Sequence, residues 1–364
     1  MIEIIPLEYY YSLFINGALF LVLLTMVHTF AVKIDDQKNL QYINVLGYTM
    51  LFFLILYIGL RPVSGKYFTD MRTYANSFEL YASGGEVLTD KDVFFHYFMK
   101  ICSGIMGVHG FFFICALVYL FPMYKISKVF FKEYWFYSFL MFVVSFSFWS
   151  YGTNGIRNGM ATSIFLWGIA YQDKKAVMAF LFLVATMTHK TLLLPILAYI
   201  MTMFVNQPKW YFKFWLLAIP LSIALGGFWT SLFTSLGFGD DRLGAYLSGE
   251  GASTSFRFDF LIYSASAVAT GWYFIFKRNY KDEIYYRLFN TYLITNAFWI
   301  LVIRANFSNR FAYLSWFMMA IVIVYPFLKQ ELDRKHIVIG RVVMLYFTFT
   351  YFMVYIYYGI IKSS

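Results

Sequence analysis

The sequence predicts an all-α, polytopic integral membrane protein with about 12 transmembrane helices. Its composition is 61% hydrophobic, 23% aromatic and 13% charged, with a mean hydropathy of +0.63. These values exclude a soluble globular domain. The first apolar run follows the acidic residues Glu3 and Glu8 rather than a basic segment, and no small-residue cleavage site follows it. We therefore expect a retained helix there and not a signal peptide.

Apolar runs of roughly 20 residues, the length that crosses a bilayer, set the positions of the expected helices. They cover residues 7–32, 42–60, 106–124, 134–151, 156–172, 211–236, 259–276, 287–303, 311–328 and 340–361. No repeat and no Pro-, Gly- or Ser-rich linker interrupts the chain. The sequence thus predicts one transmembrane domain over residues 1–364.

The stretch 176–205 is too long for one crossing and too short for two full ones, and it carries His189 and Lys190 in its middle. If two short helices meet near His189, the short basic loops all fall on one side. These loops hold 17 of the 29 Lys and Arg residues, at 33–38, 125–132, 174–175, 209–213, 277–287 and 329–341. The positive-inside rule then predicts a cytoplasmic location for them, twelve helices and both termini outside. A single helix over 176–205 would put the later basic loops on the opposite side.

The two longest connections, 61–105 and 237–258, then lie on the outer side. In the first, apolar residues recur with helical spacing at Tyr67, Met71, Tyr74, Phe78 and Tyr81. A second short helix is expected from residue 93, with Thr89 and Asp92 as a capping box. We expect both helices to lie in the outer membrane interface.

Four arginines stand at the ends of apolar segments on this outer side. They are Arg61, Arg157, Arg304 and Arg310. A charge next to hydrocarbon is costly unless an anion or a polar cavity receives it, which favours a phosphate-binding site. The structural alternative is that these arginines extend to the interface and bind nothing.

Two polar segments surround these arginines. Arg157 opens a helix that follows Tyr151, and Asn154 and Asn158 stand one turn apart beside it. A helix N-terminus with a guanidinium is suited to a phosphate. The segment 304–310 holds two arginines and two asparagines, among them Asn309, four residues before Tyr313. It is interpreted as a phosphate clamp, with a plain turn flanked by interfacial arginines as the alternative.

Two residues are candidates for a general base. Asp70 lies on the polar face of the first interfacial helix, one turn before Tyr74, where it could take a proton from a sugar hydroxyl. His189, followed by Lys190, interrupts an apolar stretch, and such breaks often line a cavity. Asp70 could equally be a solvated charge, and His189 an interfacial hydrogen-bonding residue. We assign Asp70 as the base and His189 as a phosphate donor.

No metal or cofactor is expected, because the sequence holds no H-E-x-x-H or D-x-D element. The net charge of +10 is spread over loops between apolar runs and forms no basic stripe. Membrane lipid, and not nucleic acid, is therefore the expected counter-charge. Cys102 and Cys115 show neither metal spacing nor a disulfide framework.

Four segments of the chain resemble the EpsG-like branch of Wzy-type polysaccharide polymerases. They occur in the family's order, within residues 59–326: GLRPVSGKYFTDMRTY, NGIRNGMA, THKTLLLP and SNRFAYLSWFMM. Each is short and unspecific alone, and their order makes the resemblance. Lys190 and Thr191 depart from it, because serine is frequent after the histidine in the family.

The resemblance implies a GT-C-type fold and a glycosyltransferase of the bacterial inner membrane. It implies that oligosaccharide units carried on undecaprenyl pyrophosphate, as donor and acceptor, are joined into O-antigen, capsule or exopolysaccharide. A chain-length regulator is a further partner that it suggests. Two other functions remain open: a ligase that transfers finished glycan to lipid A, and a flippase or transporter. Acidic residues avoid the apolar runs almost entirely, which disfavours transport.

Overall fold

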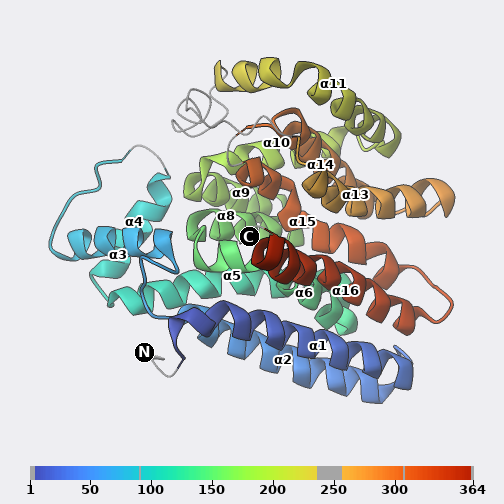
Figure 1. Ribbon diagram of the computed structural model, residues 1–364, viewed down its shortest axis with the longest axis horizontal. Helices are drawn as coiled ribbons and strands as arrows, with labels where there is room; N and C mark the ends of the chain where they lie inside the picture. Colours follow the sequence, from blue (N-terminus) through green and yellow to red (C-terminus); the bar gives the residue numbers. More distant parts are fainter. Residues whose placement is uncertain (1–4, 90–91, 236–255, 306–307, 362–364) are drawn as a thin grey trace. The chain divides into compact units, whose positions relative to one another are not determined.

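The computed structural model describes residues 5–89, 92–235, 256–305 and 308–361, and every regular element within these ranges is a helix (Figure 1). The chain divides into two compact units, residues 1–190 with 327–364, and residues 191–326. The expected all-helical architecture is confirmed. Whether the units behave as one domain stays a prediction.

The first unit contains two amphipathic helices and eight others. Its helices are α1 (Tyr10–Ala31), α2 (Gln37–Gly59), α3 (Thr69–Ala82), α4 (Val93–Ser103), α5 (Val108–Phe131), α6 (Trp135–Val143), α7 (Phe148–Thr153), α8 (Ile156–Ala170), α9 (Lys175–Thr188) and α16 (Lys335–Phe352). A π-helix at Met353–Ile361 continues α16. The second unit has α10 (Leu193–Phe204), α11 (Pro208–Ser235), α13 (Phe258–Trp272), α14 (Glu283–Leu301) and most of α15 (Ser308–Lys329).

Six helical stretches in the described ranges are long and apolar enough to cross a membrane, as expected of a multi-pass membrane protein. They are Leu7–Ala31, Gln37–Gly59, Val108–Val143, Pro208–Trp229, Arg310–Lys329 and Lys335–Tyr357. The expected helix over 134–151 is wrong as one element, because α6 ends at Val143 and α7 starts at Phe148. Helix α8 has 15 residues, fewer than one crossing needs, whereas α13 is continued without a break by a π-helix at Tyr273–Lys277. The total of about 12 transmembrane helices stays a prediction.

The predicted interruption at His189 is confirmed. Helix α9 ends at Thr188, and His189 is extended, with φ −152° and ψ 114°. A 3-10 turn at Lys190–Leu192 then leads into α10. Two short apolar helices therefore meet where the polar pair stands.

The connection 61–105, which is predicted to lie on the outer side, forms the two expected short helices, α3 and α4. In α3, Met71, Tyr74, Phe78 and Tyr81 are buried as the stripe predicted, whereas Tyr67 lies before the helix and is exposed. The capping box is wrong. Asp92 is the N-cap residue of α4, in the left-handed region with φ 52°, and its side chain makes no capping bond. That carboxylate has another partner, described below.

A buried polar network joins four helices of the first unit at the end opposite to α3 and α4. The Asn39 Oδ1 accepts a hydrogen bond from the Tyr137 hydroxyl at 2.8 Å and lies 3.2 Å from the His28 Nε2. Tyr137 also hydrogen-bonds to His336. Helices α1, α2, α6 and α16 each contribute one of these side chains. The network sets where the four helices meet, because a buried polar group is costly unless it is paired.

Removing the centre of this network should destabilise the first unit. Asn39→Ala leaves the Ile34 carbonyl, the Tyr137 hydroxyl and the His28 ring each short of one partner. We expect a loss of about 1–3 kcal/mol in unfolding free energy, measured as a lower unfolding temperature in detergent. Asn76→Ala, at an exposed position of α3, is the control. Equal unfolding temperatures for the two variants would contradict the role given to the network.

Candidate functional site

The site is built on the start of α8, which follows α7 after a two-residue connection. The N-cap of α8, Gly155, makes no side-chain capping bond. Gly159 allows the close approach of the two helices, since a Cβ there would lie 2.3 Å from the Tyr151 carbonyl oxygen. The N-terminus of α8 therefore presents the positive end of a helix dipole, and Arg157 stands in its first turn.

Two buried side chains hold α7 in place before this turn. Arg61 is 1% exposed, and its guanidinium donates to the carbonyl of Ile58 and, at 2.9 Å, to that of Thr153. Tyr119 donates its hydroxyl to the Phe148 carbonyl at 2.9 Å. Burial lowers the pKa of Arg61 to about 10, so the guanidinium stays charged at neutral pH. Through these contacts Arg61 positions the connection between α7 and α8.

Arg157 forms an ion pair with Asp92 of α4. The Arg157 Nη1 lies 2.8 Å from the Asp92 Oδ2, and the two side chains are 26% and 8% exposed. The other carboxylate oxygen of Asp92 accepts the backbone N–H of Lys190 at 3.1 Å. One carboxylate thus links the connection 61–105, the N-terminus of α8 and the break between α9 and α10.

Tyr74 and Asp70 join this cluster from α3. The Arg157 guanidinium carbon lies 5.7 Å from the centre of the Tyr74 ring. Burial raises the pKa of the Tyr74 hydroxyl to about 12, although Arg157 opposes the shift and Asp70 and Asp92 add to it. Asp70 is exposed in the first turn of α3. The predicted base therefore lies in solvent, one turn from a tyrosine that contacts the arginine.

The asparagines beside Arg157 carry acceptors that the described residues leave unused. The side-chain oxygens of Asn154 and Asn158 are buried, and each lacks a hydrogen-bond partner within the described ranges. Asparagine can present either its oxygen or its NH₂ group. A polar ligand at the start of α8 would meet both side chains, and Tyr151 is half-buried next to them.

His96, on α4, borders the same cluster. Its Nδ1 lies 3.0 Å from the Tyr81 hydroxyl. Burial lowers the pKa of His96, and the charge of Arg157 lowers it further, while Asp92 acts in the opposite direction. The ring is thus neutral at neutral pH and adds no charge to the site.

The remaining predicted residues belong to the second unit. Arg304 is half-buried, and its Nη2 donates to the Ile223 carbonyl at 3.4 Å, next to the non-helical residue Leu225 of α11. Arg310 is exposed in the first turn of α15, and Tyr313 is buried. The side chain of Asn309 and most of the predicted outer loop 237–258 lie outside the described residues. A phosphate-binding role for this group stays a prediction.

No metal centre is found in the part of the chain that the structure describes. No three His, Cys, Asp or Glu side chains in those ranges are placed to hold an ion. Cys102 and Cys115 are buried free thiols.

The family comparison covers all the segments that form this cluster. The model of the EpsG family matches residues 44–363. The chain belongs to the EpsG family. This family is associated with exopolysaccharide biosynthesis. No curated protein and no solved structure matches the chain.

In this EpsG-family chain, the sequence-predicted site residues Asp70, Tyr74, Arg157, His189 and Lys190 all lie in the first unit, and their roles stay predictions. Sequence reasoning assigned Asp92 only to a helix cap. An aspartate before an apolar helix fits a capping pattern whether or not its side chain caps. One feature of the sequence could have indicated the contact: Asp92 and Arg157 carry opposite charges, and both stand at the starts of helices that are predicted to begin on the outer side.

Neutralising Asp92 should loosen the break at Lys190. Asparagine keeps the shape of the side chain and tolerates the left-handed backbone, so Asp92→Asn removes the charge alone. We expect a loss of about 1–3 kcal/mol in unfolding free energy, between the values for exposed and buried pairs. Amide hydrogen exchange should quicken at residues 189–192.

The matched control is Glu79→Gln, at an exposed carboxylate of α3. It should leave the exchange of residues 189–192 unchanged. Exchange in Asp92→Asn at the wild-type rate would show that Asp92 does not hold the break.

Proposed function

We propose that this EpsG-family protein is a membrane glycosyltransferase of the polysaccharide polymerase type. It joins lipid-linked oligosaccharide repeat units at the outer face of the bacterial inner membrane. The observation that carries the proposal is the placement of Arg157. This arginine stands at an uncapped helix N-terminus, is held by Asp92, and keeps part of its surface exposed. Family membership and the apolar helices support the same assignment.

An arginine in this position suits a pyrophosphate leaving group. When the bond between the donor sugar and the pyrophosphate breaks, negative charge grows on the phosphate oxygens. A planar guanidinium donates two parallel hydrogen bonds to such oxygens without a metal ion. The helix dipole of α8 acts in the same direction.

The pair with Asp92 reduces the net positive charge at Arg157, so a second cation is needed. Lys190 is exposed and follows the break, and its backbone N–H contacts the same carboxylate. We assign the Lys190 ammonium group to the outer phosphate of the donor pyrophosphate, with His189 as a hydrogen-bond donor to the same phosphate. Asn154 and Asn158 then supply amide groups to the ligand.

Asp70 is assigned as the general base of the transfer. The acceptor hydroxyl gives its proton to the Asp70 carboxylate, and its oxygen forms a bond to the anomeric carbon of the donor sugar. The bond from that carbon to the pyrophosphate oxygen breaks, and undecaprenyl pyrophosphate leaves with the electron pair. The configuration at the anomeric carbon is inverted. Tyr74, one turn from Asp70, links the base to Arg157.

The length of the glycan made in cells tests the proposal. A strain that lacks the gene should carry single repeat units, and the wild-type gene should restore polymer. Arg157→Lys keeps the charge but loses the planar fork. We therefore expect it to shorten or abolish polymer nearly as strongly as Arg157→Ala, on a gel that resolves chain length and at equal expression.

The same gel separates the other functions. A flippase mutant would carry no glycan at the surface, and a ligase mutant would accumulate finished polymer on the lipid carrier. Full-length polymer from Arg157→Ala would remove Arg157 from the site.

Asp70→Asn should abolish transfer while donor binding persists, because the amide keeps the shape and loses the basicity. His189→Ala should weaken donor binding as well, and Glu79→Gln should change neither.

A further inference from the structure

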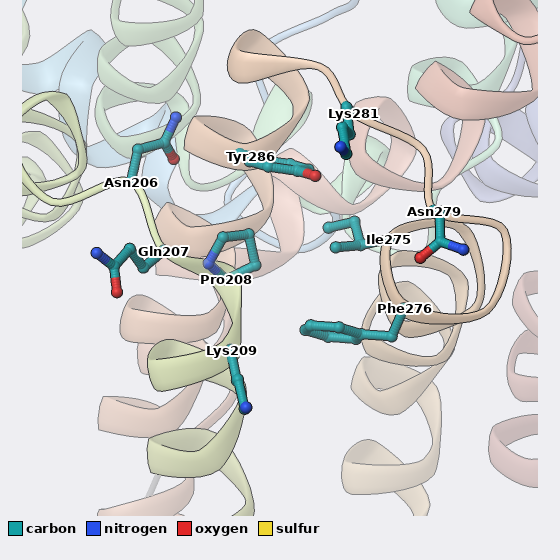
Figure 2. Close-up of a pocket in the computed structure, with 9 residues that line it drawn as sticks. All are labelled: Asn206, Gln207, Pro208, Lys209, Ile275, Phe276, Asn279, Lys281 and Tyr286. Carbon is teal, nitrogen blue, oxygen red and sulfur yellow. The ribbon is translucent and has the colours of Figure 1, made fainter.

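The second unit contains a cavity of about 390 Å³ that the proposed transfer does not use. It lies where the connection from α10 to α11 meets the connection from α13 to α14 (Figure 2). Its lining is Asn206, Gln207, Pro208, Lys209, Ile275, Phe276, Asn279, Lys281 and Tyr286. The loops that form it are among the short basic loops assigned to the cytoplasmic side.

The cavity is basic and holds no carboxylate. Its two charged residues are Lys209 and Lys281, both exposed, and no ion pair joins either to an acidic side chain in the described ranges. The carboxylate of Asp282, the neighbour of Lys281, accepts hydrogen bonds from other residues. Its oxygens accept from the Tyr285 N–H at 2.8 Å and from the hydroxyls of Tyr280 and Tyr325 at 3.2–3.3 Å. These neutral donors leave Asp282 charged, but neither lysine forms an ion pair with it in the described ranges, so both ammonium groups can contact an external anion.

The wall of the cavity is fixed by hydrogen bonds. The Asn206 Nδ2 donates to the Glu283 carbonyl at 3.1 Å, and its Oδ1 accepts from the buried Asn290 at 3.0 Å. The Tyr286 hydroxyl donates to the Tyr280 carbonyl at 3.0 Å. Figure 2 shows the Tyr286 ring between the two connections, with Lys281 and Asn279 on one side and Gln207 and Lys209 on the other. These hydrogen bonds hold the two backbone segments that carry Lys209 and Lys281, and the lysine side chains themselves are exposed and make none of them.

The surroundings favour a lipid over a soluble anion. Trp210 is 63% exposed, and the Lys213 ammonium lies 5.0 Å from the centre of its ring. On the other helix the Lys277 ammonium lies 5.3 Å from the centre of the exposed Trp272 ring. Tryptophan and lysine side chains of this kind mark the interface between headgroups and hydrocarbon. Exposed apolar residues, among them Phe214 and Leu217, continue along α11 from this level.

We propose that this cavity binds the phosphate headgroup of an anionic phospholipid. Lys209 and Lys281 contact the phosphate, and the amides of Gln207 and Asn279 contact the polar part of the headgroup. Ile275, Phe276 and Pro208 supply the apolar part of the cavity, and the acyl chains extend along α11. Basic pockets between membrane helices are known to select such headgroups.

The test compares two charge-matched double variants of the full-length protein. Lys209→Gln/Lys281→Gln removes both cavity lysines, and Lys213→Gln/Lys277→Gln removes two lysines that pair with tryptophan and do not line the cavity. Each protein is equilibrated with phosphatidylcholine vesicles that contain phosphatidylglycerol. Native mass spectrometry then counts the phosphatidylglycerol that each protein retains.

We expect the preference for phosphatidylglycerol over phosphatidylcholine to fall about tenfold or more in the cavity variant. The control variant should keep the wild-type preference. Lys209→Arg/Lys281→Arg should keep it too, which separates lost charge from lost folding. Equal retention by the cavity and control variants would overturn the proposal. Displacement of the lipid by millimolar inorganic phosphate would also overturn it, because the site would then be one for soluble phosphate. This readout needs no glycosyl transfer, so it stands or falls separately from the polymerase assignment.

Discussion

The arrangement of the candidate site depends on one ion pair, between Asp92, the N-cap residue of α4, and Arg157 of α8. A carboxylate that is 8% exposed loses much of its hydration, and the loss is offset only if both of its oxygens are bound. Here one oxygen contacts the guanidinium and the other accepts the Lys190 N–H. The Asp92 side chain therefore connects the start of α4, the start of α8 and the break between α9 and α10. It adds a polar contact to the buried apolar cluster in which Phe95, Ile156 and Met160 pack together.

The elements around this pair place an arginine at a helix terminus instead of letting it extend freely into the interface. Arg61 and Tyr119 bind the backbone of α7, and Gly159 lets the first turn of α8 pass close to Tyr151. Precise placement matters for an anion that develops charge during a reaction, because donors that are already oriented need no reorganisation. In the second unit, hydrogen-bonded asparagine and tyrosine residues hold the two backbone segments that carry Lys209 and Lys281.

Sequence reasoning located the elements that are governed by local pattern. The stripe of α3 and the break at His189 were predictable because helical spacing and a polar pair in an apolar run are local signals. It failed where tertiary contacts decide. Nothing local shows that 134–151 is interrupted between α6 and α7, that Arg61 is buried against backbone carbonyls, or that Asp92 turns away from its own helix. The Asp92–Arg157 contact joins residues far apart in sequence, so no local pattern reports it.

A double-mutant cycle on purified protein tests the central claim most directly. Asp92→Asn, Arg157→Lys and the double variant would be compared with wild type for kcat/KM on lipid-linked repeat units. If Asp92 acts by holding Arg157 against the pyrophosphate, the double variant should be hardly worse than Arg157→Lys alone, which gives a coupling energy of about 1 kcal/mol or more. Losses that simply add would show that the two residues act independently, and wild-type activity in Arg157→Lys would show that the arginine does not bind the leaving group.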